Sequence, residues 1–499
     1  MPTLSADDIA ELTGARSWAH QEREFDEHKD DRARALFWAM RSGKSKAVID
    51  KFDYQFDWGE IEGAILFAPN GVHINWVLNE IPRWGRDDVA FAWETPKRGD
   101  PAYQVKFEEF LHDKRMKWLC INQEALIHDD CRKAINRFLS ATHRKFAVAV
   151  SEAHHFGRSG ATRTKKLRNL THHARFVTIE TGTPLLAGPL KAYSLLKILG
   201  GDEAIPGYEG NSYEKFVKHF AVISLDMSLP PSKRRKAYQK ITAYQNVDEL
   251  RTMFVPFASV VLRKDIDDMP ALLRIDRPVV MSDKQRTAYV EMVSKFILDV
   301  DGGKVTALDA GARVQKLQQI INGYIKDEDG IHDIDPDAPI YKALVEQVDG
   351  TLPGKAIVWC RFREDIVRCA IALTKAKFKV LEFHGGIPVG KREPIRRHFQ
   401  SAKPEERVVL VGNPGAGGEG RDFSEADAII HFSSTPKAIH VEQGNERGTA
   451  RGGRSTTIVR LRTYGTVDDR NWDIVEGRVT MADTVSGQGL RNLLMATDV

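Results

Sequence analysis

The segment Gly43-Lys44-Ser45 contains the residue types that a phosphate-binding loop requires. Glycine lets backbone N–H groups face phosphate oxygens, lysine brings a positive charge to the β/γ oxygens, and a serine hydroxyl ligates Mg²⁺. As a bare pattern the segment is incomplete, because the first glycine of GxxxxGK[ST] would fall at Trp38. An ordinary turn therefore stays open as the alternative.

Polar residues also follow two predicted strands farther along the chain. The apolar run FAVAV (146–150) leads directly into Ser151 and Glu152, and RFVTIE (175–180) leads into the segment TGTP at 181–184. A carboxylate at the end of a buried strand is placed to orient an attacking water in phosphoryl transfer. The order of these segments after a GKS loop favours one nucleotide site over a set of unrelated turns.

Two regions of the chain alternate short β-branched runs with helical patterns. The first contains AILFAP (64–69), WLCIN (118–122), FAVAV (146–150) and RFVTIE (175–180). The second contains KAIVWC (355–360), KVLEF (379–383), RVVLV (407–411), DAIIHF (427–432) and TTIVRL (456–461). Strands that alternate with helices predict parallel sheets covered on both faces, and hence an α/β protein with two lobes.

The pattern between these regions turns helical. We therefore expect a first lobe at 1–205, a helical insertion and linker at 206–350, a second lobe at 351–480 and a C-terminal tail at 481–499.

The composition is that of an ordinary globular protein, with 42% hydrophobic and 28% charged residues among 499. There is no apolar stretch long enough for a membrane span and no secretory pattern at the N-terminus, so we expect a cytoplasmic location. The cysteines form no CxxC pair, and the histidine pairs at 154–155 and 172–173 lack a completing carboxylate or cysteine. This spacing argues against zinc. The net charge of +4 neither requires nor excludes nucleic acid.

The motifs together resemble one family. The series HQ, MRSGKS, APNGVHINW, SEAH and TGTP is similar to the first lobe of superfamily-two motors of the Swi/Snf type, especially the compact forms that bacteriophages encode. The second half is similar in VWCRFRED, FHGGIPVGKREPIRRHF, GNPGAGGEGRDF and VEQGNERGTARGG. The resemblance implies two RecA-like lobes with a helical insertion between them.

The same resemblance implies an ATP hydrolase that uses Mg²⁺ and moves along double-stranded DNA. Single-stranded DNA and RNA stay open as ligands, no membrane is implied, and protein partners are not specified. A phage-encoded member would act in the host cytoplasm.

Residue roles follow from the resemblance, position by position. Gln21 would read the adenine edge, Lys44 would hold the β/γ phosphates, and Glu152 would position the hydrolytic water. The implied nucleotide-binding residues are His20, Gln21, Arg41, Ser42, Gly43, Lys44, Ser45, Lys46 and Gly420. The implied DNA-binding residues are Asn70, Thr181, Gly182, Thr183, His384, Gly385 and Gly417.

Two arginines of the second lobe would reach across the cleft to the γ-phosphate. The family usually has a glutamine followed by arginine at +4 and +7. Gln443 and Arg447 fit this spacing, whereas position +7 is Ala450 and the next arginine is Arg451.

The metal site departs from the family pattern. Ser45 would ligate Mg²⁺ directly, and Ser151 and Glu152 would act through water, but the family has an aspartate where this chain has Ser151. The loss of an outer-shell carboxylate typically costs about 10–100-fold in metal affinity or activity. Two hypotheses follow: a working DNA-stimulated translocase, or a nucleotide-gated DNA-binding protein with weak or absent hydrolysis.

Overall fold

A computed structural model gives the fold of the chain. It describes residues 17–94, 97, 99–182, 188–208, 212–225, 239–267, 269, 272–301, 307–351, 354–415, 423, 426–446 and 455–486. The main division between two compact units falls between Ile266 and Asp267, inside the segment 206–350. No described helix combines the length and the apolar character needed to cross a membrane.

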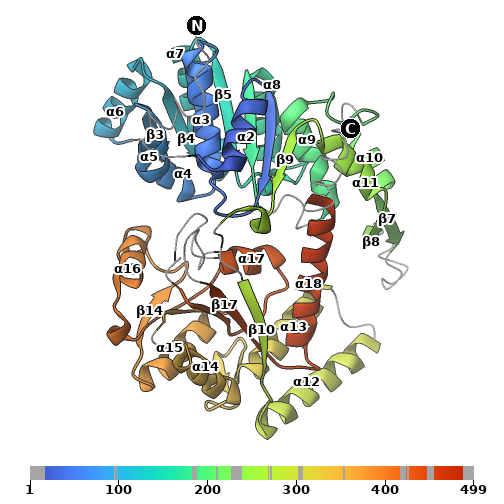
Figure 1. Ribbon diagram of the computed structural model, residues 1–499. Helices are drawn as coiled ribbons and strands as arrows, with labels where there is room; N and C mark the ends of the chain where they lie inside the picture. The colour runs from blue at the N-terminus through green and yellow to red at the C-terminus, as the bar shows by residue number, and fades with distance from the viewer. Residues whose placement is uncertain are drawn as a thin grey trace. The chain divides into compact units, whose positions relative to one another are not determined.

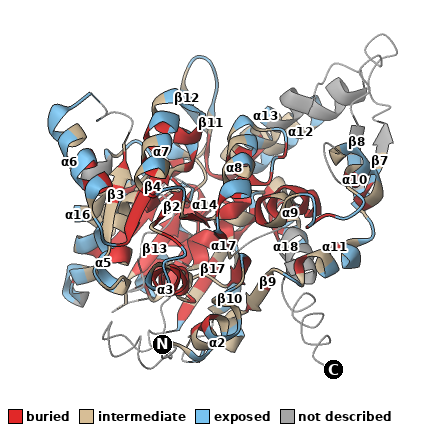
Figure 2. Cartoon of the chain, turned by 90° about the horizontal axis from the view of Figure 1, so that it is seen from above, coloured by how far each residue is buried: buried red, intermediate tan, exposed pale blue. Residues whose placement is uncertain are grey.

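The first unit is built on a seven-stranded parallel sheet with the order β3-β4-β2-β5-β6-β1-β9 (Figure 1). Its strands are β1 (Ala33–Trp38), β2 (Gly63–Ala68), β3 (Val89–Trp93), β4 (Lys117–Asn122), β5 (Phe146–Ser151), β6 (Phe176–Glu180) and β9 (Ala258–Val261). Its main helices are α2 (Ala19–His28), α3 (Lys44–Asp57), α4 (Val72–Asn75), α5 (Ile81–Trp84), α6 (Pro101–His112), α7 (Asp129–Ala141), α8 (Thr162–His173), α9 (Ala192–Gly200), α10 (Tyr213–Phe220) and α11 (Val247–Phe254). The central strands are buried along their whole length (Figure 2).

The two faces of this sheet bury different sets of side chains, because successive residues of a strand point to opposite faces. Val148, Val150 and Ile179 belong to one large core that also contains side chains of α6, α7, α9, α10 and α11. On the opposite face, Phe52 of α3 stacks on Trp118 of β4 with ring centroids 5.6 Å apart. By alternation, Ser151 and Glu180 point to the face that α3 covers.

The second unit has a six-stranded parallel sheet with the order β10-β17-β16-β13-β15-β14. Its strands are β10 (Leu272–Pro278), β13 (Ala356–Trp359), β14 (Lys379–Phe383), β15 (Val408–Gly412), β16 (Ala428–His431) and β17 (Thr456–Arg462). Side chains of α14 (Pro339–Asp349) and α15 (Arg363–Lys375) pack on one face, and Phe399 of α16 (Val389–Ser401) packs on the other. Further helices are α12 (Asp283–Asp301), α13 (Ala307–Ile321), α17 (Ala438–Glu446) and α18 (Val467–Ser486).

The predicted fold class is confirmed, since each sheet with its flanking helices is a RecA-like α/β lobe. Every strand expected from the sequence is present, but β1, β3, β9 and β10 were not predicted. The segment 206–350 supplies more than helices: β9 joins the first sheet and β10 joins the second. It also holds two antiparallel hairpins, β7–β8 (Ala221–Leu225 and Gln239–Tyr244) and β11–β12 (Tyr324–Lys326 and Ile331–Asp333).

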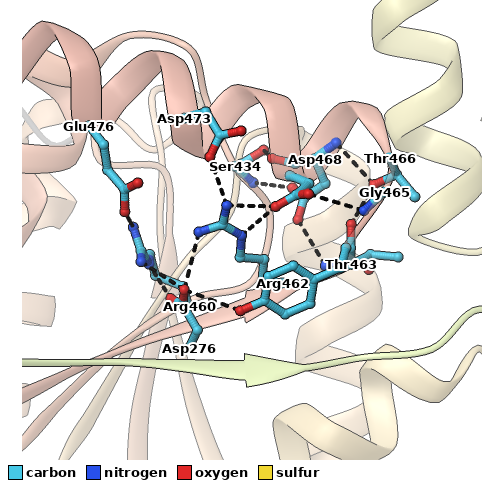
Figure 3. Close-up of polar contacts among 12 residues, drawn as sticks. Asp276, Ser434, Arg460, Arg462, Thr463, Gly465, Thr466, Asp468, Asp473 and Glu476 are labelled. Atoms are coloured by element: carbon cyan, nitrogen blue, oxygen red, sulfur yellow. Dashed lines mark hydrogen bonds and ion pairs between the residues drawn. The ribbon is translucent and has the colours of Figure 1, made fainter.

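A charge network holds the edge strand β10 against β17 (Figure 3). Asp276 of β10 accepts hydrogen bonds from Arg460 and from Arg462, the latter at 3.1 Å. The same arginines reach α18, where Arg462 contacts Asp469 at 2.6 Å and Arg460 contacts Glu476 at 2.6 Å. Charge-assisted, paired contacts of this kind are stronger than ordinary hydrogen bonds. Asp276 therefore ties β10, β17 and α18 together.

We predict that Asp276→Ala loosens β10. The change leaves two arginines without a shared acceptor, which should cost about 1.5–3 kcal/mol. Hydrogen exchange of residues 272–278 should rise by roughly tenfold or more, since about 1.4 kcal/mol corresponds to a factor of ten. The control Glu476→Ala removes one half-exposed contact of Arg460 and should change exchange far less. Equal effects of both changes would contradict this role of Asp276.

Candidate nucleotide site

The predicted phosphate loop connects the buried strand β1 to α3. Trp38 is the last residue of β1 and is fully buried, so the position where the general pattern has glycine lies in the strand and not in the loop. Gly43 takes a left-handed backbone with φ 76° and directly precedes Lys44, the first residue of α3. Arg41 is also left-handed, with φ 62°, which glycine would adopt at lower cost. Strained backbone of this kind clusters at functional sites.

Residues of α2 brace the loop. Gln21 is buried; its Nε2 donates to the Gly43 carbonyl at 2.8 Å and its Oε1 accepts from the Trp18 amide at 2.7 Å. His20 Nε2 lies 2.7 Å from the Ser42 carbonyl. The structure thus brings His20 and Gln21 to the loop, where they fix its backbone. Adenine recognition by Gln21 stays a prediction.

Lys44 and Ser45 occupy the first turn of α3, where free N–H groups and the helix dipole favour an anion. The Lys44 ammonium donates to the carbonyls of Trp38 at 3.1 Å and Ala39 at 3.0 Å. It therefore lies over the start of the loop. Lys46, grouped with the loop in the sequence, is instead buried and pairs with Asp50 one turn along the helix at 2.6 Å.

A polar triangle lies just beyond β5 and β6. His154 Nδ1 is 3.0 Å from Thr181 Oγ1 and 3.2 Å from Glu152 Oε2, and the Thr181 hydroxyl donates to the same carboxylate at 3.4 Å. Burial would raise the pKa of Glu152, but the contact with His154 and the charges of His154 and Lys44 hold it below its ordinary value. Glu152 is thus kept as a carboxylate, as a residue that orients water requires. Its backbone is left-handed, with φ 51°, so Glu152 joins Arg41 as a second strained non-glycine residue at this edge.

Glu180 is a carboxylate that the sequence analysis did not select. It ends β6, stands beside Ser151 in the register of the two strands, and is 4% exposed. Burial raises the pKa of Glu180 to about 7, against the opposing effects of the Lys44 charge and the Ser151 hydroxyl. The sequence does show a glutamate at the end of an apolar strand just before TGTP. It does not show to which face of the sheet this side chain points or which residues lie beside it.

Several buried polar atoms at this edge have no hydrogen-bond partner in the part of the chain that the structure describes. They are Ser42 Oγ, Gln123 Oε1, His154 Nε2 and Glu180 Oε2. The Nε2 of Gln123, another residue missed from the sequence, donates to the Ser151 carbonyl at 2.7 Å and so supports the end of β5. Unsatisfied buried groups of this kind need an explanation. Phosphate oxygens and a hydrated Mg²⁺ have the donors and acceptors to satisfy them, so these residues fit both groups.

The predicted DNA-binding residues of the first unit lie at the same end of the sheet. Asn70 is exposed just after β2, Thr181 is buried just after β6, and Gly182 is half-buried. Thr183 lies outside the described residues.

In the second unit, His384 and Gly385 follow the edge strand β14, and His384 Nδ1 accepts from the Gly386 amide at 3.1 Å. Gly417, Gly420, Arg447 and Arg451 lie outside the described residues.

The helix that precedes the two arginines is anchored to the second sheet. Asn445 of α17 contacts His431 of β16 at 2.7 Å, and the Gly444 carbonyl accepts from Trp359 Nε1 at 3.2 Å. Burial lowers the pKa of His431 to about 4, despite the hydrogen bond with Asn445. The neutral histidine therefore fixes the end of α17, from which the chain continues to Arg447.

We predict that Gly43→Ala disturbs α2 as well as the loop. A Cβ at this position would lie 2.2 Å from Gln21 Nε2, so Gln21 must move and its bond to Trp18 is put at risk. Hydrogen exchange at residues 18–28 should increase.

Gly59→Ala is the matched control, because Gly59 has a similar φ of 70° but no neighbouring atom within 4 Å of the added carbon. This control should cost only the backbone strain, about 1 kcal/mol, and leave α2 unchanged. If both changes affect α2 alike, Gln21 does not brace the loop.

Comparisons with known proteins find similarity to helicases. Residues 340–453 match the family model of the helicase conserved C-terminal domain, which is less than half of the chain. An uncharacterized ATP-dependent helicase of Mycoplasma genitalium is 23% identical over 333 residues, 65% of this chain and 29% of the relative. The DNA annealing helicase and endonuclease ZRANB3 of Bos taurus is 20% identical over 349 residues, 68% of this chain and 30% of the relative.

The chain thus spans about three tenths of the length of these relatives. Among solved structures, the Sulfolobus solfataricus SWI2/SNF2 ATPase core in complex with double-stranded DNA is similar, with 16% identity, a TM-score of 0.40, and coverage of 95% of this chain and 94% of that chain.

Proposed function

We propose that this chain is an ATP-driven motor of the Swi/Snf type that moves along double-stranded DNA. The observation that carries the proposal is the turn from β1 into α3, which puts a lysine, a serine hydroxyl and the N-terminus of a helix at one point. The helicase C-terminal match over 340–453 supports it independently, because it concerns the other unit. The likeness to compact bacteriophage-encoded members stays a prediction.

In this proposal the first unit binds ATP with Mg²⁺. The backbone N–H groups around Gly43 and the Lys44 ammonium hold the β/γ phosphates, and Ser45 ligates the metal. When bound, Mg²⁺ neutralises charge that develops on the phosphates. Glu152 orients the attacking water, while His154 and Thr181 hold that carboxylate in place. Arg447 and Arg451 are proposed to contact the γ-phosphate.

The DNA contacts are proposed at turns that follow strands. Asn70 and the segment 181–183 serve in the first unit, and His384, Gly385 and Gly417 in the second. Hydroxyl and backbone N–H groups at such turns bind phosphates without reading sequence. One relative is named a DNA annealing helicase, which favours DNA as the ligand. Swi/Snf-type motors track duplexes without separating strands, so we propose translocation without unwinding.

A second candidate function follows from Ser151. With a hydroxyl where the family has an aspartate, the site has one carboxylate fewer on β5. Nucleotide binding would then survive better than turnover, and the protein would act as a nucleotide-gated DNA-binding protein.

We predict that Lys44→Ala weakens ATP binding and abolishes DNA-stimulated phosphate release, because the loop loses its only lysine charge toward the β/γ oxygens. Lys133→Ala, which changes an exposed lysine on α7, serves as the control and should behave like the unchanged protein. Both quantities are measured by fluorescent-nucleotide titration and by steady-state phosphate release.

The same release assay with duplex DNA, single-stranded DNA and RNA tests the ligand. Duplex DNA should stimulate most. Intact ATP binding without stimulation by any nucleic acid would favour the gated binding protein, and ATP binding that is indifferent to Lys44→Ala would remove both candidates. Robust strand displacement would contradict translocation without unwinding.

A further inference from the structure

Glu180 and Ser151 form a neighbouring pair at the end of the first sheet. They are register partners on the parallel strands β6 and β5, and both point to the face that α3 covers. Neighbouring strands lie about 4.8 Å apart, a distance that one glutamate side chain can span. A carboxylate on β6 can therefore reach the space next to the Ser151 hydroxyl.

Glu180 is buried and has an oxygen that a cation, or water bound to a cation, could contact. It is 4% exposed, and its Oε2 has no hydrogen-bond partner among the described residues. Within those residues it forms no ion pair, and the nearby Lys44 ammonium donates to two loop carbonyls instead. A buried carboxylate oxygen without a hydrogen-bond partner is costly. Bringing a positive charge to this position would offset that cost.

Glu80, a half-buried glutamate of the same unit, shows the contrast. Glu80 has both oxygens occupied, since Oε1 accepts from Asn75 at 3.2 Å and Oε2 accepts from Trp84 at 3.3 Å. Both oxygens of Glu80 thus have partners on the adjoining helices α4 and α5, whereas Oε2 of Glu180 has none among the described residues. Oε2 of Glu180 lies at the edge of the sheet where β5 ends and where the loop after β1 begins.

We propose that Glu180 supplies the carboxylate of the Mg²⁺ site that Ser151 does not supply, accepting a hydrogen bond from metal-bound water while the Ser151 hydroxyl assists. This inference rests on the proposed ATP site. The family has this carboxylate on β5, at position 151, whereas here it lies on the neighbouring strand β6 at the paired position 180. The number of negative charges around the metal is therefore the same. Glu180 is a positioning residue here, and its role favours the working ATPase over the gated binding protein.

The test is a titration of Mn²⁺, used in place of Mg²⁺, into the full-length protein saturated with ADP, with free Mn²⁺ measured by electron paramagnetic resonance. Glu180→Gln should weaken Mn²⁺ binding by about 10–100-fold, as expected for loss of an outer-shell partner. Its ADP affinity in EDTA should stay unchanged. Glu108→Gln, which changes an exposed glutamate on α6, is the control and should keep the Mn²⁺ affinity of the unchanged protein. Ser151→Asp combined with Glu180→Gln should restore binding, because it returns one carboxylate to the pair.

Unchanged Mn²⁺ affinity in Glu180→Gln overturns the inference and leaves the proposed motor intact, provided that Lys44→Ala still weakens ADP binding. If the unchanged protein binds no ADP, the proposed function itself fails. Glu180→Gln removes a buried charge, so its melting temperature should equal or exceed that of the unchanged protein. If the Glu180→Gln protein unfolds, Glu180→Asp is tested in its place. The shorter side chain should weaken Mn²⁺ binding, and an unchanged Mn²⁺ affinity would overturn the inference.

Discussion

Parallel strands all end at the same edge of their sheet, and the candidate site depends on this constraint. In the first unit, β1, β5 and β6 deliver the phosphate loop, Ser151 and Glu180 to one edge, although these segments are far apart in the sequence. Ligands bind at the carboxyl ends of strands in open α/β sheets for this reason. The left-handed conformations of Arg41 and Glu152 show that the backbone is strained where the strands end. Packing of the surrounding core maintains that strain.

Three charged groups determine the electrostatics at the edge of the first sheet where its strands end. Lys44 brings one positive charge, and Glu152 and Glu180 bring carboxylates into a region with little water. His154 and the Lys44 charge keep Glu152 ionised, whereas Glu180 has the Ser151 hydroxyl beside it and its Oε2 has no hydrogen-bond partner among the described residues. The two neighbouring glutamates therefore differ: Glu152 is held by His154 and Thr181, whereas one oxygen of Glu180 has no partner in the described part of the chain.

Much of the fold could be predicted from the sequence, because most strands of parallel sheets are continuous apolar runs. Of the missed strands, β3 (VAFAW) and most of β1 (ALFW) are also continuous apolar runs that the prediction did not include, whereas β10 lacks that property. In β10 the residues Arg274, Asp276 and Arg277 interrupt the apolar pattern. Their partners are Glu442 of α17, Arg460 and Arg462 of β17, and Glu346 of α14, which no local pattern reveals. β9 is only four residues long. The loop residues of the site were found from their order along the chain, whereas Glu180 could be recognised only once the register placed it beside Ser151.

A crystal structure of the chain with a non-hydrolysable ATP analogue and Mn²⁺, located by its anomalous scattering, tests the account most directly. We expect the β/γ phosphates on the N–H groups that begin α3, with the Lys44 ammonium moved from the carbonyls of Trp38 and Ala39 to the phosphates. The Mn²⁺ peak should lie next to Ser45, with its water shell touching Glu180. A nucleotide bound away from this loop, or phosphates in place with Lys44 still on those carbonyls, would contradict the account.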